Sequence, residues 1–377
     1  MKYFLIAGEP SGDMHGANLM RGILEADPMA EFRFWGGDKM AEVGGCENLG
    51  MHYRETSFMG FVQVALHIGK IMGQIRLCRR QIAEFRPDVV VLIDYAGFNL
   101  KIAQYAKSLG ITTHYYIAPK VWAWNEKRVE KLRRWVDELF IIFPFEREYF
   151  AQKGIEVHFK GNPLVDALAM RQAAMGDRAT FVAENGLDER PIIALLAGSR
   201  RSELRENIPI MQRIAESFEQ YQFVVAGVDW IGHDVYDKYL INSSIRFVKG
   251  KTYELLHHST AAVVTSGTAT LETALIGVPQ VVVYHIPWLH EVLRPLVLKI
   301  PYISLVNINL QRECVCEIVQ SSTDATRAIE SLRAILPDGQ LRERMLVDYD
   351  ELRTIIGESG ASRRFAAKMV ELLKKER

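Results

Sequence analysis

The chain has 377 residues, of which 49% are hydrophobic and 24% are charged, so it favours two globular domains that each bury a core. Lysine plus arginine and aspartate plus glutamate both number 46, which argues against a nucleic acid partner. The four cysteines form no disulfide framework, and no apolar run reaches the roughly 18 residues of a membrane span, so a cytoplasmic protein is expected.

The first half of the chain alternates short apolar runs with helical patterns. Continuous apolar strands separated by helices are typical of a parallel sheet that is covered on both faces. This half therefore predicts an α/β domain over residues 1–170. The expected strands are 3–7, 32–36, 89–94, 113–118, 139–143 and 157–161.

The same pattern begins again after the polar stretch 171–190. Two successive α/β halves predict two Rossmann-like domains that face each other across a cleft, the second over 171–345, with helices in 346–377 packing back across the junction. Ligands of such sheets bind beyond the carboxyl ends of the strands, where the functional residues are expected. The strands expected in the second half are 191–198, 223–227, 245–250, 261–267 and 280–285.

The opening loop reads GEPSGDMHG, residues 8–16. Its glycine spacing matches neither the dinucleotide fingerprint nor the P-loop, and Glu9 and Asp13 would repel a pyrophosphate. We expect Glu9, Ser11 and Asp13 to contact a neutral, hydroxyl-rich group such as a sugar. The alternative for Asp13 is a helix cap.

Residues 58–80 form an amphipathic pattern with basic side chains along its rim. Such helices lie at membrane interfaces, although most amphipathic helices face a protein core. The residues of the expected membrane or acyl-chain surface are Phe61, Val62, Val64, Ile68, Ile71 and Met72.

Asp94 ends the apolar run 89–94. A carboxylate at the carboxyl end of a buried strand is well placed for general-base work, because partial burial raises its pKa. The alternative is that Asp94 caps the helix expected to begin near Phe98.

Two strand ends in the second half predict anion sites. Ser199 and Arg200 follow the first of these strands, and Ser266, Gly267 and Thr268 follow another, each where a helix begins. Glu272 lies one turn further on, where a carboxylate can accept hydrogen bonds from ribose hydroxyls. Together they predict a site for a nucleoside diphosphate.

The residues give little support for a metal. The only Asp-x-Asp triplet, Asp348 to Asp350, lies in a helical pattern in which residues two apart diverge. We therefore expect an enzyme that needs neither a metal nor another cofactor.

Several segments together closely resemble the lipid A disaccharide synthase family, and they follow the family's order over most of the chain. Two of them depart from the usual family pattern, because Ala197 and Val306 replace prolines. The segments are GEPSGD (8–13), FMGFVQV (58–64), DVVVLIDYAGFN (88–99), YYIAPKVWAWNEKRV (115–129), FPFE (143–146), AGSRRSE (197–203), SGTATLE (266–272) and YISLVN (302–307).

The resemblance implies a GT-B fold and an inverting transfer of 2,3-diacylglucosamine from UDP to the 6-hydroxyl of 2,3-diacylglucosamine 1-phosphate (lipid X). It implies Asp94 as the catalytic base. Glu9, from the opening loop, is a second catalytic candidate. The donor would bind the C-terminal domain. Its implied contacts are Arg200, Glu272 and Asn307, with Gly250 and Thr252 as candidates for the uracil pocket.

The resemblance also implies peripheral docking on the cytoplasmic face of the inner membrane, since both substrates carry acyl chains. A homodimer is left open. The rival enzymes are a UDP-N-acetylglucosamine 2-epimerase and the N-acetylglucosaminyltransferase that makes the peptidoglycan precursor. A rival of another class is a non-catalytic lipid or nucleotide carrier.

Overall fold

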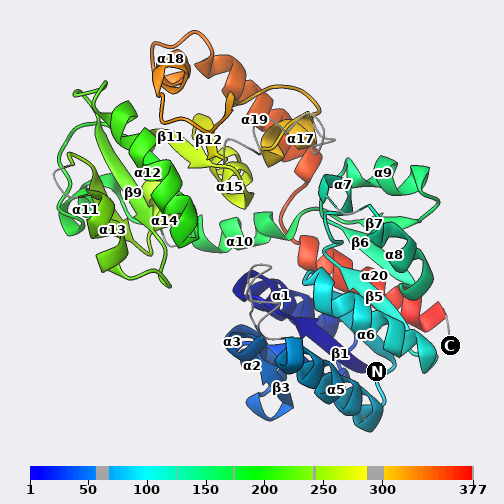
Figure 1. Ribbon diagram of the computed structural model, residues 1–377. Coiled ribbons are helices and arrows are strands. Elements are labelled where there is room, and N and C mark those ends of the chain that lie inside the picture. Colours follow the sequence, from blue (N-terminus) through cyan, green and yellow to red (C-terminus); the bar gives the residue numbers. More distant parts are fainter. Residues whose placement is uncertain (57–67, 125, 173–174, 241–242, 287–300, 376–377) are drawn as a thin grey trace. The chain divides into compact units, whose positions relative to one another are not determined.

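The computed structural model describes residues 1–56, 68–124, 126–172, 175–240, 243–286 and 301–375. Its contacts divide the chain into two compact units (Figure 1). Unit 1 comprises Met1–Asp166 and Gly357–Arg377, and unit 2 comprises Ala167–Ile356. Each unit is built around one parallel sheet.

The sheet of unit 1 has the order β3-β2-β1-β4-β5-β6-β7 within the described residues, and all its pairs are parallel. Side chains alternate along β1, so Tyr3 and Leu5 join one core cluster while Phe4 and Ile6 join the other. The strands are β1 (Lys2–Ala7), β2 (Glu31–Gly36), β3 (Leu49–His52), β4 (Val89–Ile93), β5 (Thr112–Tyr116), β6 (Glu138–Ile141) and β7 (Val157–Phe159).

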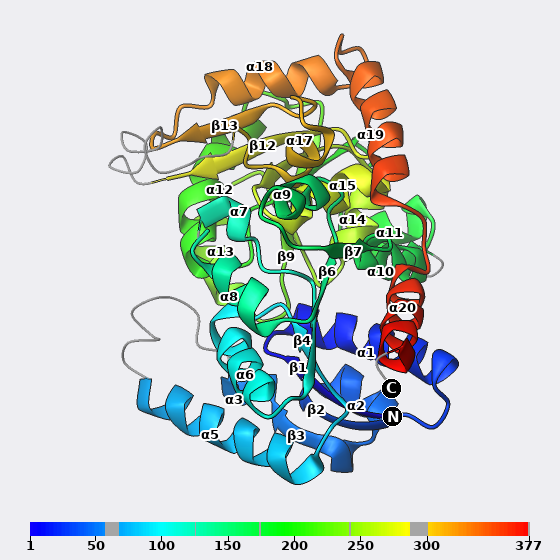
Figure 2. The same ribbon diagram turned by 90° about the vertical axis from the view of Figure 1, so that its right-hand side faces the viewer.

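Helices cover both faces of this sheet. α1, α2 and α20 bury apolar residues in one cluster, and α5, α6 and α8 do so in the other. Figure 2 shows α1 and α20 side by side. The helices of unit 1 are α1 (Pro10–Ala26), α2 (Asp38–Gly44), α3 (Tyr53–Thr56), α5 (Ile68–Phe85), α6 (Ala96–Ser108), α7 (Val121–Trp124), α8 (Arg128–Trp135), α9 (Glu146–Gln152) and α20 (Ala361–Lys375), with a 3₁₀ turn at Cys46–Asn48.

Unit 2 repeats the arrangement with the strand order β10-β9-β8-β11-β12-β13 in its described part. Its strands are β8 (Ile192–Leu196), β9 (Gln222–Gly227), β10 (Arg246–Lys249), β11 (Ser259–Thr265), β12 (Gln280–His285) and β13 (Glu317–Gln320). Its helices are α11 (Arg178–Glu184), α12 (Arg201–Ala215), α13 (His233–Leu240), α14 (Thr252–His257), α15 (Thr268–Ile276), α17 (Leu305–Leu310), α18 (Thr326–Ile335) and α19 (Arg342–Ile356), while α10 (Pro163–Gln172) runs from one unit into the other.

The C-terminal segment that the sequence predicts over 346–377 is divided between the units. α19 stays with unit 2, where Arg353 Nε donates to the carbonyl oxygen of Leu275 at 3.2 Å. α20 belongs to unit 1. There the carboxylate of Asp166 accepts hydrogen bonds from the backbone N–H groups of Gly360, Ala361 and Ser362 at 2.5, 3.1 and 2.8 Å.

The segment that is expected to meet a membrane is described only in part. Phe61, Val62 and Val64 lie outside the described residues, and α5 begins at Ile68. Ile71 is half-buried and packs on the core, which corrects its assignment to an outward surface, whereas Met72 is 42% exposed. None of the described helices is both long and apolar enough to cross a bilayer.

Candidate functional site

Both sheets reverse their strand order at one point, which is where open α/β sheets bind ligands. In unit 1 this point lies between β1 and β4, where Ala7 pairs with Ile93. In unit 2 it lies between β8 and β11, where Leu196 pairs with Val264. Most of the predicted site residues follow one of these four strands.

Asp94 lies on a strained turn at the end of β4. Asp94 and Tyr95 have φ angles of 45° and 47°, a left-handed conformation that costs energy in residues other than glycine. The Asp94 backbone is fixed, because its N–H donates to Tyr116 O at 3.1 Å and its carbonyl oxygen accepts from Asn99 Nδ2 at 2.8 Å and from the Tyr115 hydroxyl at 2.6 Å. The turn therefore presents the Asp94 carboxylate from a backbone that hydrogen bonds hold in place.

Asp94 does not cap the following helix, the alternative role that its position allows. α6 begins at Ala96 after Tyr95, and no side chain caps it. The surrounding protein raises the pKa of the Asp94 carboxyl by desolvation, and the charge of Lys120 opposes the shift. A carboxylate with a raised pKa is a better proton acceptor, as a general base requires.

Glu9 and Ser11 belong to the same edge. Glu9 precedes the first turn of α1, and Ser11 is exposed within that turn. A Cβ atom on Gly8 would lie 2.4 Å from the Tyr95 ring, so only glycine lets this ring approach the loop. Burial raises the pKa of Tyr95, and the negative charge of Glu9 adds to the shift. The β1 and β4 loops thus meet at Tyr95.

Asp13 has a different role from its predicted one. Its carboxylate is buried and accepts hydrogen bonds from the N–H groups of Gly37 at 2.7 Å, Lys39 at 3.1 Å and Met40 at 3.1 Å. These N–H groups lie at the start of α2, where orphan donors need a partner. Asp13 is therefore a structural cap of α2, and not of its own helix α1, which no side chain caps.

In unit 2, the loop after β8 has the expected anion-binding groups but a carboxylate already occupies them. Glu203 accepts from the N–H groups of Ser199 at 2.8 Å and Arg200 at 3.2 Å, and it pairs with the Arg200 guanidinium at 3.3 Å. Gly198, with φ of 112°, leaves room for the Glu203 side chain. Glu203 thus stands where an anionic ligand would find its donors.

The loop after β11 contacts the loop that precedes α17. Ser266 Oγ donates to Ile303 O at 2.9 Å, and Leu305 N–H donates to Thr270 Oγ1 at 3.2 Å. Gly267 precedes Thr268 at the first turn of α15, and no atom of the described residues lies within 4 Å of the place that a Cβ atom on Gly267 would take. The structure therefore brings the SGT and YISLVN segments together.

Asn307 is fully buried and its side chain is fully engaged. Its Nδ2 donates to Val315 O and Glu317 Oε1, both at 2.8 Å, and its Oδ1 accepts from Cys314 N at 2.8 Å and Val315 N at 3.0 Å. Asn307 therefore shapes the loop around it. The sequence predicts that Asn307 contacts the UDP-sugar, but the hydrogen bonds of its side chain do not support such a contact.

The other residues predicted to bind the UDP-sugar lie near Tyr253; they are Glu272, Thr252 and Gly250. The Tyr253 hydroxyl donates to Glu272 Oε1 at 2.9 Å, and the Arg171 guanidinium stacks 4.1 Å from the ring centroid. Burial raises the pKa of Glu272, while Tyr253 and Arg171 lower it. Thr252 begins α14, directly before Tyr253, and Gly250 adopts a φ of 72° in the same loop.

The Asp-x-Asp triplet is engaged in ion pairs. Arg312 Nη2 lies 2.7 Å from Asp348 Oδ1, and Asp350 pairs with Arg353. The described residues contain no cluster of three or more His, Cys, Asp or Glu that could hold a metal.

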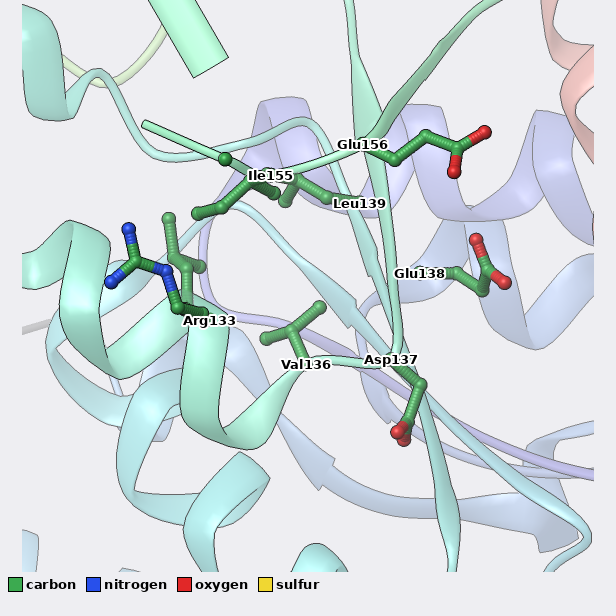
Figure 3. Close-up of a pocket in the computed structure, with 9 residues that line it drawn as sticks. Arg133, Val136, Asp137, Glu138, Leu139, Ile155 and Glu156 are labelled. Carbon is green, nitrogen blue, oxygen red and sulfur yellow. The ribbon is translucent and has the colours of Figure 1, made fainter. Parts of the chain in front are cut away.

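A cavity of about 220 Å³ lies at the opposite, amino-terminal end of β6 (Figure 3). Arg133 lies on one side of this cavity, and the carboxylates of Glu138 and Glu156 point away from it. Because it is far from the carboxyl ends of the strands, we do not assign it to the site.

The chain is similar in sequence over nearly its whole length to enzymes of one family. A family model described as lipid-A-disaccharide synthetase matches residues 3–369. The chain is 34% identical to a lipid-A-disaccharide synthase of Myxococcus xanthus, over 99% of this chain and 97% of that protein. It is 33% identical to one of Geobacter metallireducens, over 100% and 98% of the two chains.

Solved structures with little sequence identity have the same fold. A Methanocaldococcus jannaschii UDP-GlcNAc 2-epimerase, solved in complex with UDP-GlcNAc and UDP, has a TM-score of 0.66 at 15% identity, with both chains fully covered. A sucrose-phosphate synthase of Thermosynechococcus elongatus has a TM-score of 0.63 at 11% identity, again over both whole chains. These neighbours and the two parallel sheets confirm the predicted GT-B fold.

Proposed function

This chain belongs to the lipid-A-disaccharide synthase family, a family of glycosyltransferases, and from that premise we propose the reaction that it catalyses. The enzyme transfers 2,3-diacylglucosamine from UDP to the 6-hydroxyl of 2,3-diacylglucosamine 1-phosphate. The products are the β(1→6) disaccharide and UDP. The single observation that best supports this proposal is the rigid, strained turn that presents Asp94 at the switch point of unit 1.

On the acceptor side, Asp94 accepts the proton of the attacking hydroxyl. The hydroxyl oxygen forms a bond to the anomeric carbon while the bond from that carbon to UDP breaks on the opposite face, and UDP leaves with the electron pair. Even with its raised pKa, a carboxylate cannot remove an alcohol proton in advance, so proton transfer accompanies bond formation. Glu9 and Ser11 orient the acceptor sugar from the adjacent loop.

On the donor side, the diphosphate binds the N–H groups of Ser199 and Arg200 and the Arg200 guanidinium. Glu203 now engages all three groups and must move aside when the donor binds. The first turn of α15, at Gly267 and Thr268, provides a second set of N–H donors. These preorganised donors stabilise the charge that develops on UDP, so the proposed reaction needs no metal.

The proposal is tested by mass spectrometry of the product from synthetic UDP-2,3-diacylglucosamine and lipid X, with and without a chelator. We expect a disaccharide 1-phosphate and UDP in both samples, and NMR of the product should show a β-anomeric linkage. A product that forms only without chelator would overturn metal independence. Conversion of UDP-N-acetylglucosamine alone to its 2-epimer would instead identify the rival epimerase activity.

We also propose that the enzyme docks on the inner membrane from the cytoplasmic side. Each acyl methylene that leaves the bilayer costs about 0.8 kcal/mol, so extraction of either substrate into water is prohibitive. The expected contact residues are Phe61, Val62, Val64, Ile68 and Met72.

Docking is tested by sedimentation with vesicles of inner-membrane lipids. Changing Val64, Ile68 and Met72 together to serine should release the protein, while Met29→Ser serves as the matched control because Met29 is 82% exposed on another segment. Equal sedimentation of the triple variant and the wild type would contradict docking through this segment.

A further inference from the structure

Three neighbouring strands of unit 1 carry charged residues beyond their carboxyl ends. β4, β5 and β6 are adjacent in the sheet, and they are followed by Asp94, Lys120 and Glu146. The carboxyl ends of parallel strands lie at the same edge, so these residues share the edge of the proposed acceptor site. The sequence patterns predict a role only for Asp94, although Lys120 and Glu146 both lie in segments that resemble the family.

Glu146 is the fixed member of this group. It is 1% exposed, and its carboxylate accepts hydrogen bonds from Trp122 Nε1 at 3.0 Å and from Phe143 N–H at 3.1 Å. The Trp122 ring also packs edge-on against Phe145, with ring centroids 4.9 Å apart. Glu146 thereby ties the segment after β5 to the segment after β6.

Lys120 is the member of this group whose charge is accessible to a ligand. Its side chain is exposed, and its Nζ lies 5.8 Å from the centroid of the Phe143 ring. Among the described residues it forms no ion pair within 4.0 Å. Its charge nevertheless acts on both acids, since it lowers the pKa of Asp94 and of Glu146 against the effect of burial. An ammonium that is held on an aromatic ring without a close counter-ion is ready for an anionic ligand.

We propose that Lys120 is the acceptor-specificity residue, whose ammonium binds the phosphate on the acceptor sugar while Asp94 receives the proton of the hydroxyl. This inference rests on the proposed function. In the acceptor, the 6-hydroxyl and the 1-phosphate are carried by the two ring carbons that flank the ring oxygen, the hydroxyl through C6, so both lie on the same side of the pyranose ring. A base and a cation that share one edge of the sheet, as Asp94 and Lys120 do, can therefore serve the two groups together. Glu146, Trp122 and Phe143 act as positioning residues for Lys120.

The test compares kcat/KM for two acceptors, lipid X and the same diacylglucosamine without its phosphate, in wild type and in Lys120→Met. Wild type should prefer the phosphorylated acceptor. Lys120→Met should lose about 10- to 100-fold on that acceptor, the usual effect of a charge-assisted hydrogen bond. On the acceptor without phosphate, Lys120→Met should lose less than about threefold, because Lys120 has no charged group to bind there. Lys120→Arg should keep most of the preference.

A matched control is available in α8. Lys131 lies 6.0 Å from the centroid of the Trp135 ring, a similar lysine on an aromatic side chain in a helix. Lys131→Met should match wild type on both acceptors. Melting temperatures of the variants check that each is folded.

Two results would overturn the inference while the proposed function stands. One is equal loss on both acceptors with the acidic limb of the pH profile moved upward, which would mean that Lys120 only keeps Asp94 ionised. The other is a wild type that turns over both acceptors equally well. No transfer by wild type to either acceptor would instead overturn the proposed function, and this inference with it.

Discussion

The two switch points have the same topology but opposite chemistry. At the edge of unit 1, the strand ends carry the acids Glu9 and Asp94, and the turn at Asp94 is strained. At the edge of unit 2, the strand ends carry glycine, serine and threonine residues. Their backbone N–H groups lie at the N-termini of α12 and α15. The strand order thus decides at which edge a ligand can bind in each unit, and a few loop residues decide which groups that edge presents, carboxylates in unit 1 and backbone N–H donors in unit 2.

The largest expected effect comes from Asp94→Asn, which removes the proton acceptor and keeps the shape of the side chain. Turnover should fall roughly 100- to 10,000-fold, the range for loss of a general base. UDP affinity, measured by calorimetry, should stay unchanged because the donor groups lie in unit 2. Turnover near that of wild type would remove Asp94 from the mechanism and end the contrast between the two edges.

Arg200→Met tests the anion-binding edge. Loss of this preorganised charge should weaken UDP binding and lower turnover about 100-fold. Arg205→Met is the matched control, since Arg205 is an exposed arginine in α12, the helix that begins directly after Arg200. If both variants bind UDP as wild type does, the diphosphate binds elsewhere.

Glu146 makes the stability of unit 1 depend on pH. Burial raises the pKa of its carboxyl from 4.5 to about 7, with Trp122, the Phe143 N–H group and Lys120 opposing the shift. Because the folded state holds this proton more tightly, the contribution to stability is complete below pH 4.5 and is lost as the pH rises through about 7. Glu146→Gln should remove this slope, which amounts to at most about 3 kcal/mol in urea unfolding at a series of pH values. An identical slope in the variant would contradict the assignment.

Asp13→Ala tests whether Asp13 only stabilises the fold, in contrast to the proposed general base Asp94 at the same edge. Loss of the cap on α2 should reduce the free energy of unfolding by about 2 kcal/mol. At a temperature where the variant is folded, kcat should stay within about threefold of wild type, because the hydrogen bonds of the side chain within the described residues all go to backbone N–H groups of α2 and its N-terminus. A fall in kcat as large as that of Asp94→Asn would restore the predicted contact with substrate.

The smallest effect is expected for Glu203→Gln. The change removes a negative charge that competes with the diphosphate for Ser199 and Arg200, while an amide oxygen can still cap the helix. UDP should bind up to about fivefold more tightly, since exposed charge pairs contribute about 1 kcal/mol or less. Weaker UDP binding in calorimetry would mean that Glu203 itself contacts the donor.

The site residues show how far strand-end reasoning extends. It selected Asp94, Ser199 and Ser266 correctly as strand-end residues, because an apolar run that stops at a polar residue is visible in the sequence. It could not separate Asp13 from Glu9, since the partner N–H groups of Asp13 come from residues 37–40. It also missed Lys120, whose relation to Asp94 exists only because β4 and β5 are neighbours.

The sequence by itself determined the class of this protein: two parallel α/β sheets, a family, and the strand ends that carry function. These features depend on local periodicity and on motif order, which the linear chain contains. Only the tertiary structure decided which polar groups already have partners. Asn307 is engaged by residues 314–317, Asp13 by residues 37–40, and the N–H groups of Ser199 and Arg200 by Glu203. Whether a polar group can act on a ligand depends on hydrogen bonds that folding has already formed, with partners that are distant in sequence for Asp13 and only a few residues away for Ser199 and Arg200.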